Sequence, residues 1–275
     1  MSSFGDRIGI EFITGHGMDP AEFVHLAADL DVGQVGLALA PILLVPEDAP
    51  RWSLREDKAL YAAVQSALAA RGVRVMLAEG FMIHPAMDIA HAAADLDLFA
   101  GLGAGLANCL SMEPDTARAH DQFAQFAEMT AARGMAASLE FLPGLAIDSF
   151  DKALACARAA TVGKAGALVD AMHFFRTGGT IEALKAADPA LIGHIQLCDV
   201  PLVSTAESYG LEAKCDRLAP GEGELPLRAF LEALPRDLPI GLEVPQQSKG
   251  LAGVSHRERI GAVVAAARKV STGLL

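Results

Sequence analysis

The sequence lacks the cysteine spacing of a zinc ribbon or of a disulfide framework. Its four cysteines are scattered, and none belongs to a CxxC pair: Cys109, Cys156, Cys198 and Cys215. Zinc ribbons and small disulfide-rich domains both depend on closely spaced cysteines. We therefore expect reduced thiols that are mostly packed in the interior.

Targeting and membrane-spanning segments are also lacking. The N-terminal stretch MSSFGDRIGI leads directly into a strand pattern, without the basic segment and apolar run of a secretory signal. The best apolar run, VGLALAPILLV, is interrupted by Pro41. It is also shorter than the ~18 apolar residues that a spanning helix needs. These absences predict a soluble, cytoplasmic protein that has no membrane partner.

Positive charge is scarce as well. The 22 lysines and arginines are outnumbered by 34 acidic residues, which gives a net charge of −12 and a pI near 5.1. Because such a chain repels a phosphate backbone, we expect no nucleic-acid partner. No Pro/Ser-rich or charged linker divides the 275 residues, of which 52% are hydrophobic. One domain spanning residues 1–275 is the expectation.

What the sequence does contain is a repeated alternation of apolar strands and amphipathic helices. In the first unit, RIGIEFIT is followed by a helix that Asp19 should cap, with Pro20 in its first turn. Eight candidate strands recur along the chain, at residues 7–14, 32–40, 73–82, 104–112, 136–143, 165–174, 191–200 and 238–245. Later helices are predicted at residues 53–72, 85–100, 114–133, 148–160, 179–187, 226–234 and 254–269.

Eight near-continuous apolar strands, each followed by a helix, are typical of a parallel sheet that is buried on both faces. The count predicts an α/β fold with a single (β/α)8 barrel. An open doubly wound sheet is the alternative, but no GxGxxG follows the first strand.

Polar side chains stand near the ends of four consecutive candidate strands. Glu140, Asp170, Gln196 and Glu243 each follow an apolar run. In a (β/α)8 barrel the carboxyl ends of the strands carry the active site, so these four oxygen donors could surround one ion. An all-oxygen set favours Mn²⁺ or Mg²⁺. Glu140 and Glu243 could then approach opposite faces of a substrate as base and acid.

Five segments resemble, in order, those of the xylose isomerase-like TIM barrels, a superfamily of sugar phosphate isomerases and epimerases with ketose 3-epimerases and dehydroshikimate dehydratases among its members. They are ASLEFLPG, LVDAMHFFRTGG, IGHIQLCDV, RLAPGEGELPL and IGLEVP. The resemblance implies metal ligation by Glu140, Asp170, Gln196 and Glu243, and acid–base catalysis by the two glutamates. It also implies that His173 and Arg217 contact the substrate.

The chain departs from the epimerase pattern at Gln196, where those enzymes usually carry a second histidine. The glutamine is similar to what some dehydroshikimate dehydratases carry. An amide oxygen in place of an imidazole keeps Mn²⁺ or Mg²⁺ favoured, with Co²⁺ or Zn²⁺ as alternatives.

The resemblance therefore implies a divalent-metal-dependent isomerase or epimerase. Its partner would be a small hydroxy-ketone or sugar, phosphorylated or not, and proton transfer next to the carbonyl would pass through an enediolate. The alternative is a dehydratase of the 3-dehydroshikimate type, which an apolar barrel mouth containing Phe81, Met82 and Met112 would suit. We also expect a homo-oligomer. Two other hypotheses are an AP endonuclease, which the negative charge opposes, and a metal-free binding barrel.

A second question concerns Arg176 and the Gly-rich turn that follows it. This segment leads into a predicted helix, where backbone N–H groups can hold a phosphate or a carboxylate. A plain glycine turn explains the same residues, and both interpretations stay open at this point.

Overall fold

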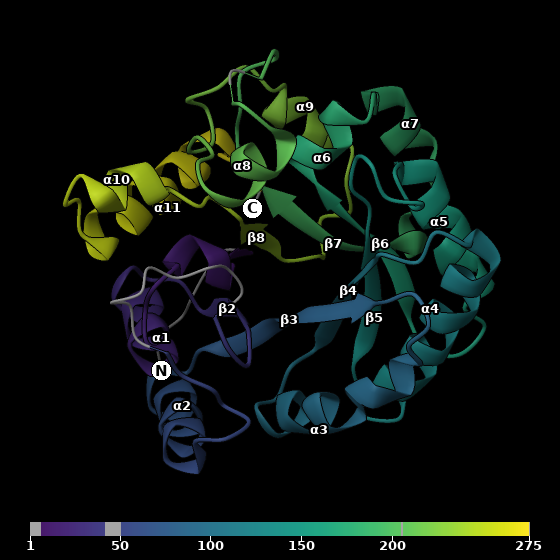
Figure 1. The fold of residues 1–275 in the computed structure, drawn as a ribbon. Coiled ribbons are helices and arrows are strands. Elements are labelled where there is room, and N and C mark those ends of the chain that lie inside the picture. The colour runs from purple at the N-terminus through teal and green to yellow at the C-terminus, as the bar shows by residue number, and fades with distance from the viewer. Residues whose placement is uncertain (1–6, 42–50, 205, 275) are drawn as a thin grey trace.

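The structure is a computed structural model that describes residues 7–41, 51–204 and 206–274. Within these residues eight parallel strands pair in chain order, and β1 (Ile8–Ile10) closes the barrel against β8 (Ile240–Leu242). Figure 1 shows helices around this ring. The predicted (β/α)8 barrel is confirmed. The remaining strands are β2 (Gln34–Leu37), β3 (Arg74–Ile83), β4 (Leu106–Ser111), β5 (Ala136–Glu140), β6 (Ala165–Asp170) and β7 (Ile192–Leu197).

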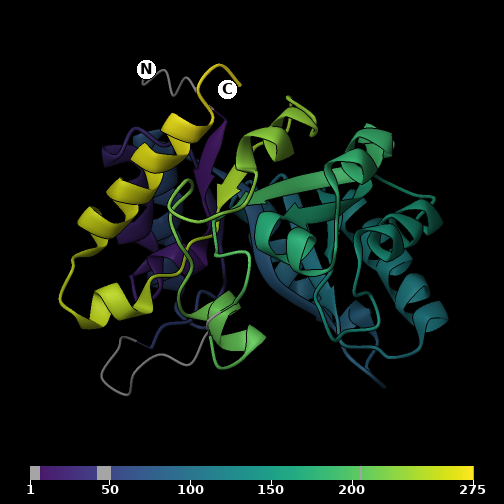
Figure 2. The ribbon, with the colours of Figure 1, turned by 90° about the horizontal axis from the view of Figure 1, so that it is seen from above.

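The helices follow the strands and cover the outside of the barrel. They are α1 (Pro20–Asp29), α2 (Lys58–Arg71), α3 (Ala93–Gly101), α4 (Thr116–Ala131), α5 (Phe150–Ala159), α6 (Ala171–Arg176), α7 (Ile181–Ala186), α8 (Tyr209–Lys214), α9 (Leu227–Glu232), α10 (Gln247–Leu251) and α11 (His256–Val270). Short 3₁₀ helices cover Phe12–Gly15, Ile89–Ala92 and Pro189–Leu191. Figure 2 shows α11, in yellow, beside the purple first elements of the chain, as the β1–β8 pairing requires.

Helix ends follow the local chemistry that the sequence indicates. The Asp19 side chain accepts hydrogen bonds from the backbone N–H groups of Ala21 and Glu22, which confirms it as the N-cap of α1. At the other end of α2, Gly72 adopts a left-handed φ of 65° and terminates the helix. Ser255 and Glu258 form a capping box at the start of α11.

Two expected strand ends are wrong. The first strand ends at Ile10 instead of Thr14, because the chain turns into a 3₁₀ helix at Phe12. The sixth strand ends at Asp170, whose side chain accepts a hydrogen bond from the backbone N–H of His173 and caps α6. In both strands a local turn or cap ends an apolar pattern that continues in the sequence. The closing helix predicted at residues 254–269 is confirmed as α11, and a further short helix, α10, precedes it.

The main core lies between the strands and the helices. Its largest fully buried side chains include Phe23 of α1, Phe99 of α3, and Phe123 and Phe126 of α4. Among the described residues, no helix is long and apolar enough to cross a membrane. Residues 42–45 of the run VGLALAPILLV lie outside the described residues. The cysteines are free thiols, as predicted; three are buried and Cys215 is partly exposed.

Candidate active site

The four predicted ligands lie at one end of the barrel. Glu140 and Asp170 are the last residues of β5 and β6, Gln196 is the penultimate residue of β7, and Glu243 follows β8 directly. Neighbouring strands are in register here, because Asp170 pairs with Gln196 and Gln196 pairs with Gly241. The four side chains therefore end consecutive strands.

A cavity of about 420 Å³ opens at this end. Glu140, Gln196 and Glu243 line it, together with His173 and Arg217, which the resemblance assigns to the substrate. Asp170 is fully buried behind these side chains and does not line the cavity.

Glu140 is held in place by a buried hydrogen-bond chain. Its Oε2 accepts from Asn108 Nδ2 at 2.9 Å, and Asn108 Oδ1 in turn accepts from the Ser138 hydroxyl at 2.9 Å. Its Oε1 lies 3.2 Å from His173 Nε2. The other ring nitrogen of His173, Nδ1, shares a hydrogen bond with the Tyr209 hydroxyl. Because each group is fixed on its far side, Glu140 Oε1 and His173 Nε2 face each other.

Asp170 is engaged by a buried arginine. Arg217 Nη1 lies 2.8 Å from Asp170 Oδ2 and 2.7 Å from Glu243 Oε2, so one guanidinium nitrogen bridges two of the predicted ligands. Burial raises the pKa of Asp170, but the nearby charges of Arg217 and His173 outweigh it and leave that pKa below its usual value. Asp170 is therefore an anion held chiefly by Arg217.

Glu243 responds differently to the same surroundings. Burial raises the pKa of Glu243 well above its usual value, and the carboxylates of Glu140 and Asp170 raise it further, against the opposing charge of Arg217. Burial therefore favours the protonated form of Glu243 more than that of an exposed glutamate, a shift in the direction that a general acid needs.

A cluster of two carboxyl groups, Glu11 and Glu79, lies beside Gln196 and was not predicted from the sequence. Glu11 at the end of β1 hydrogen-bonds Glu79 of β3 and the Gln196 amide, and its Oε1 lies 2.8 Å from His194 Nε2. Burial raises the pKa of Glu11 to about 8 and that of Glu79 well above its usual value. Two carboxyl groups this close favour sharing a proton. With its NH₂ on Glu11, Gln196 keeps a buried Oε1 that has no hydrogen-bond partner.

Glycines make room for this cluster. A Cβ at Gly36 would overlap the carboxyl groups of Glu79 and Glu11, and one at Gly241 would overlap Glu11. Glu79 and Asn108 stand on the apolar strands MLAEGF and LANCLS, as Glu140 stands on ASLEFL. The signal that identified Glu140, a polar residue inside an apolar strand, would have found both.

Three side chains form a candidate metal site. Glu140, His173 and Glu243 each offer one ligand atom, and these atoms all lie within 4.8 Å of one another. Carboxylates and an imidazole are suitable ligands for divalent transition metals. This group differs from the set predicted in the sequence, because it includes His173 in place of Asp170 and Gln196. The predicted four-ligand set therefore stays a prediction.

The upper walls of the cavity are largely apolar. Phe81, Met82 and Met112, expected at the mouth, do line it. Further apolar lining comes from Leu77, Leu110, Leu142 and Leu145. Tyr209 and Lys214 of α8 lie on the side of the long segment after β7.

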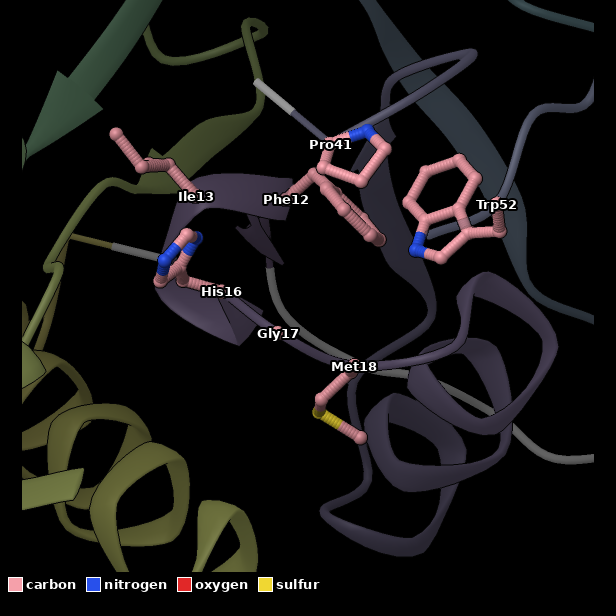
Figure 3. A pocket seen from close by; sticks show the side chains of 7 residues that line it. All are labelled: Phe12, Ile13, His16, Gly17, Met18, Pro41 and Trp52. Carbon is pink, nitrogen blue, oxygen red and sulfur yellow. The ribbon is translucent and has the colours of Figure 1, made fainter. Parts of the chain in front are cut away.

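A smaller hollow beside the loop after β1 is not a ligand site. Figure 3 shows its lining, with Phe12, Pro41 and Trp52 together and the His16 ring on the opposite side of the loop. Its volume of about 10 Å³ is close to the minimum for one water molecule. The Gly-rich turn after Arg176 is not supported as an anion site either. The Arg176 guanidinium pairs with Glu212 at 2.6 Å and donates hydrogen bonds to the carbonyls of Pro201 and Leu202.

Comparison with known proteins places the chain among related barrels. The family model for the xylose isomerase-like TIM barrel matches residues 9–262. The comparison with curated proteins found no match. A crystal structure of the IolI protein with a bound zinc atom superposes with a TM-score of 0.80 at 15% identity, covering 98% of this chain and 99% of that one.

Two further solved structures have enzymatic names. A D-psicose 3-epimerase, crystallised in the presence of D-fructose, gives a TM-score of 0.69 at 14% identity and covers 95% of this chain and 98% of that one. A probable 3-DHS dehydratase, AsbF of Bacillus anthracis, gives 0.67 at 11% identity and covers 92% and 97%. At these identities the similarity establishes the shared fold.

Proposed function

Because the chain belongs to the xylose isomerase-like TIM barrel family, we propose that it is a divalent-metal-dependent isomerase or epimerase of a hydroxy-ketone sugar. The observation that carries the proposal is the group formed by Glu140, His173 and Glu243, whose ligand atoms lie within 4.8 Å of one another in the cavity at the carboxyl ends of the strands. That end of a (β/α)8 barrel is where its catalytic sites lie.

The residues present suit a divalent ion. Glu140, His173 and Glu243 would hold it, and the unpartnered Oε1 of Gln196 is a further oxygen donor in the same cavity. Asp170 would join them only after giving up part of its pairing with Arg217. A histidine in the set makes Co²⁺ and Zn²⁺ competitors of the Mn²⁺ or Mg²⁺ that the all-oxygen set favours.

The two glutamates divide the proton transfer. A divalent ion in this position supplies charge that polarises the carbonyl of the substrate. One glutamate removes the proton from the carbon next to that carbonyl, and the other returns a proton to the opposite face. Asn108 fixes Glu140 through Oε2 and leaves Oε1 for the reaction, and burial raises the pKa of Glu243 above its usual value. Arg217, which lines the same cavity, would contact the substrate oxygens, whereas His173 would serve the ion.

A dehydratase is the second candidate, and the apolar walls favour it. Leu77, Phe81, Leu110 and Leu142 line the cavity, which suits a cyclic, partly apolar substrate better than a bare sugar. The first step is the same proton removal. The difference follows afterwards, because the β-hydroxyl leaves as water with the proton supplied by an acid, instead of a proton returning to carbon.

The test is NMR in D₂O with a panel of ketoses, their phosphates and 3-dehydroshikimate. We expect the wild-type chain with Mn²⁺ to incorporate deuterium next to the carbonyl, and Glu140→Gln and Glu243→Gln each to reduce the rate by at least roughly 10²-fold. Glu128→Gln, an exposed glutamate on α4, is the matched control and should behave as wild type. Wild-type exchange in either site variant would remove the two-glutamate mechanism, and the product formed separates isomerase from dehydratase.

A further inference from the structure

A second cavity adjoins the candidate active site. Its volume is about 190 Å³, enough for several water molecules of about 30 Å³ each or for a small anion. The loop after β1, the residues after β8 and the helices α8, α10 and α11 form its walls. Lys214 lines both cavities. Pro245 and Gln246 of this wall follow closely after Glu243 on the same strand end.

The central group of this cavity is Arg259 of α11. The residue is 7% exposed, and its Nε has no hydrogen-bond partner. No ion pair among the described residues includes Arg259, although Arg257, two residues earlier, pairs with Asp29 at 2.5 Å. Burial lowers the pKa of Arg259, as expected for a cation that is removed from water without a counter-ion. A cation that is withdrawn from water without a counter-ion lowers stability, so its retention points to a ligand that supplies the negative charge.

The other polar side chains that line the cavity are neutral or positively charged. His16 Nε2 is buried without a partner, and Lys214 supplies a second full positive charge. Burial, followed by the charge of Arg259, lowers the pKa of His16. Burial also lowers the pKa of His256, against the hydrogen bond to the His16 carbonyl and with a smaller contribution from Arg259. Gln246 is 4% exposed with an unpartnered Oε1, and its amide can accept from a P–OH or C–OH group or donate to an oxyanion. No acidic side chain lines the cavity.

We propose that this cavity binds an oxyanion, a phosphate or carboxylate group, between Arg259, His16, Lys214 and Gln246. The guanidinium matches two oxygens of such a group in a bidentate arrangement, and the imidazole and amide reach the remaining ones. The anion is either the charged end of a substrate whose ketone lies in the neighbouring cavity, which rests on the proposed function, or a free inorganic anion. Both sources share the same binding chemistry.

The experiment is calorimetric titration of the purified full-length chain with inorganic phosphate at constant ionic strength. We expect saturable binding by the wild type and at least a tenfold weaker dissociation constant for Arg259→Met, the size expected when a charge-assisted hydrogen bond is lost. Arg257→Met removes the same charge from an exposed position of the same helix and should bind as wild type.

A second variant covers the case in which Arg259→Met does not fold. Leu251 lines the cavity but is 77% exposed, so Leu251→Glu adds a negative charge at the rim without disturbing the core. It should weaken phosphate binding several-fold, whereas Leu251→Gln should not. Absence of saturable binding to the wild type, or equal binding by Arg259→Met or Leu251→Glu, overturns the proposal.

Kinetics then separate the two sources of the anion. If the site holds the substrate, phosphate competes with a phosphorylated substrate, and Leu251→Glu raises its KM while leaving that of the unphosphorylated sugar unchanged. If a free anion is bound, phosphate changes neither KM. Arg259-dependent phosphate binding by a chain that fails the D₂O test leaves the anion site standing and removes only the proposed catalysis.

Discussion

Two arginines at the same end of the barrel differ in their surroundings. Arg217 is 4% exposed and Arg259 is 7% exposed, so both guanidinium groups are withdrawn from water. Arg217 bridges the carboxylates of Asp170 and Glu243, whereas Arg259 has no ion-pair partner among the described residues. The charge of Arg217 is therefore compensated by carboxylates of the protein itself. Arg259 has no such counter-ion in the part of the chain that the structure describes, and this is the observation behind the proposed anion site.

The largest expected effect separates the two arginines by stability. Arg217→Met should lower the free energy of unfolding by about 3–5 kcal/mol, because Asp170 stays buried without its counter-ion. In phosphate-free buffer, Arg259→Met should leave that free energy unchanged or raise it, because it removes an uncompensated charge.

Urea unfolding of both variants beside the wild type measures this difference. Added phosphate should stabilise the wild type and not Arg259→Met, since a ligand of the native state adds stability by mass action. Equal losses in the two variants would show that Arg259 has a counter-ion in the native protein.

Two glycines, one near each cavity, allow the packing around the two sites to be compared. A Cβ at Gly241 would overlap the Glu11 carboxyl, so Gly241→Ala should cost about 1–3 kcal/mol and disturb the Gln196 amide. A Cβ at Gly250 of α10 would lie 3.7 Å from Arg259 Nη2, an ordinary contact. Gly250→Ala should therefore be neutral or stabilise by up to about 1 kcal/mol. Thermal unfolding compares the two, and a larger loss at Gly250 would contradict the expected packing.

The smallest effect concerns the helix that carries Arg259. Ser255 and Glu258 form the capping box of α11, so Ser255→Ala should lower stability by about 1 kcal/mol. Ser255→Asp keeps a capping acceptor and should restore most of the loss. Phosphate affinity should fall slightly in Ser255→Ala, because Arg259 lies in the second turn. An unchanged unfolding midpoint in Ser255→Ala would show that the cap does not support the helix.

Much of this arrangement could be predicted from the sequence, and the failures have identifiable causes. Apolar runs located all eight strands, because a parallel sheet buried on both faces leaves few polar residues in it. Glu140 and Glu243 stood out as carboxylates on such strands. The boundary at Asp170 was missed because the run LVDAMHF stays apolar while a side-chain cap starts a helix.

Contacts between residues that are distant in the chain could not be predicted from the sequence. Arg217 lies 47 positions from Asp170, and its charge gave no sign of which acid it would meet. Glu11 reads as one polar residue on the first strand, and its contact with Glu79 and His194 depends on the closed barrel. Arg259 likewise resembles any charged residue on an amphipathic helix. Its lack of a partner is visible only when the neighbouring elements are in place.

The closure of the ring between β1 and β8 has a consequence for folding. Ile8 pairs with Ile240, so closing the ring joins two segments that lie almost the whole chain apart. Contacts of such long sequence separation form slowly, because loop-closure entropy opposes them until the rest of the barrel is in place. The walls of the Arg259 cavity come from both ends of the chain, with His16 on one side and Arg259 on the other. Anion binding there requires both ends of the chain to be in place, so phosphate in a refolding buffer would act as a probe of barrel closure.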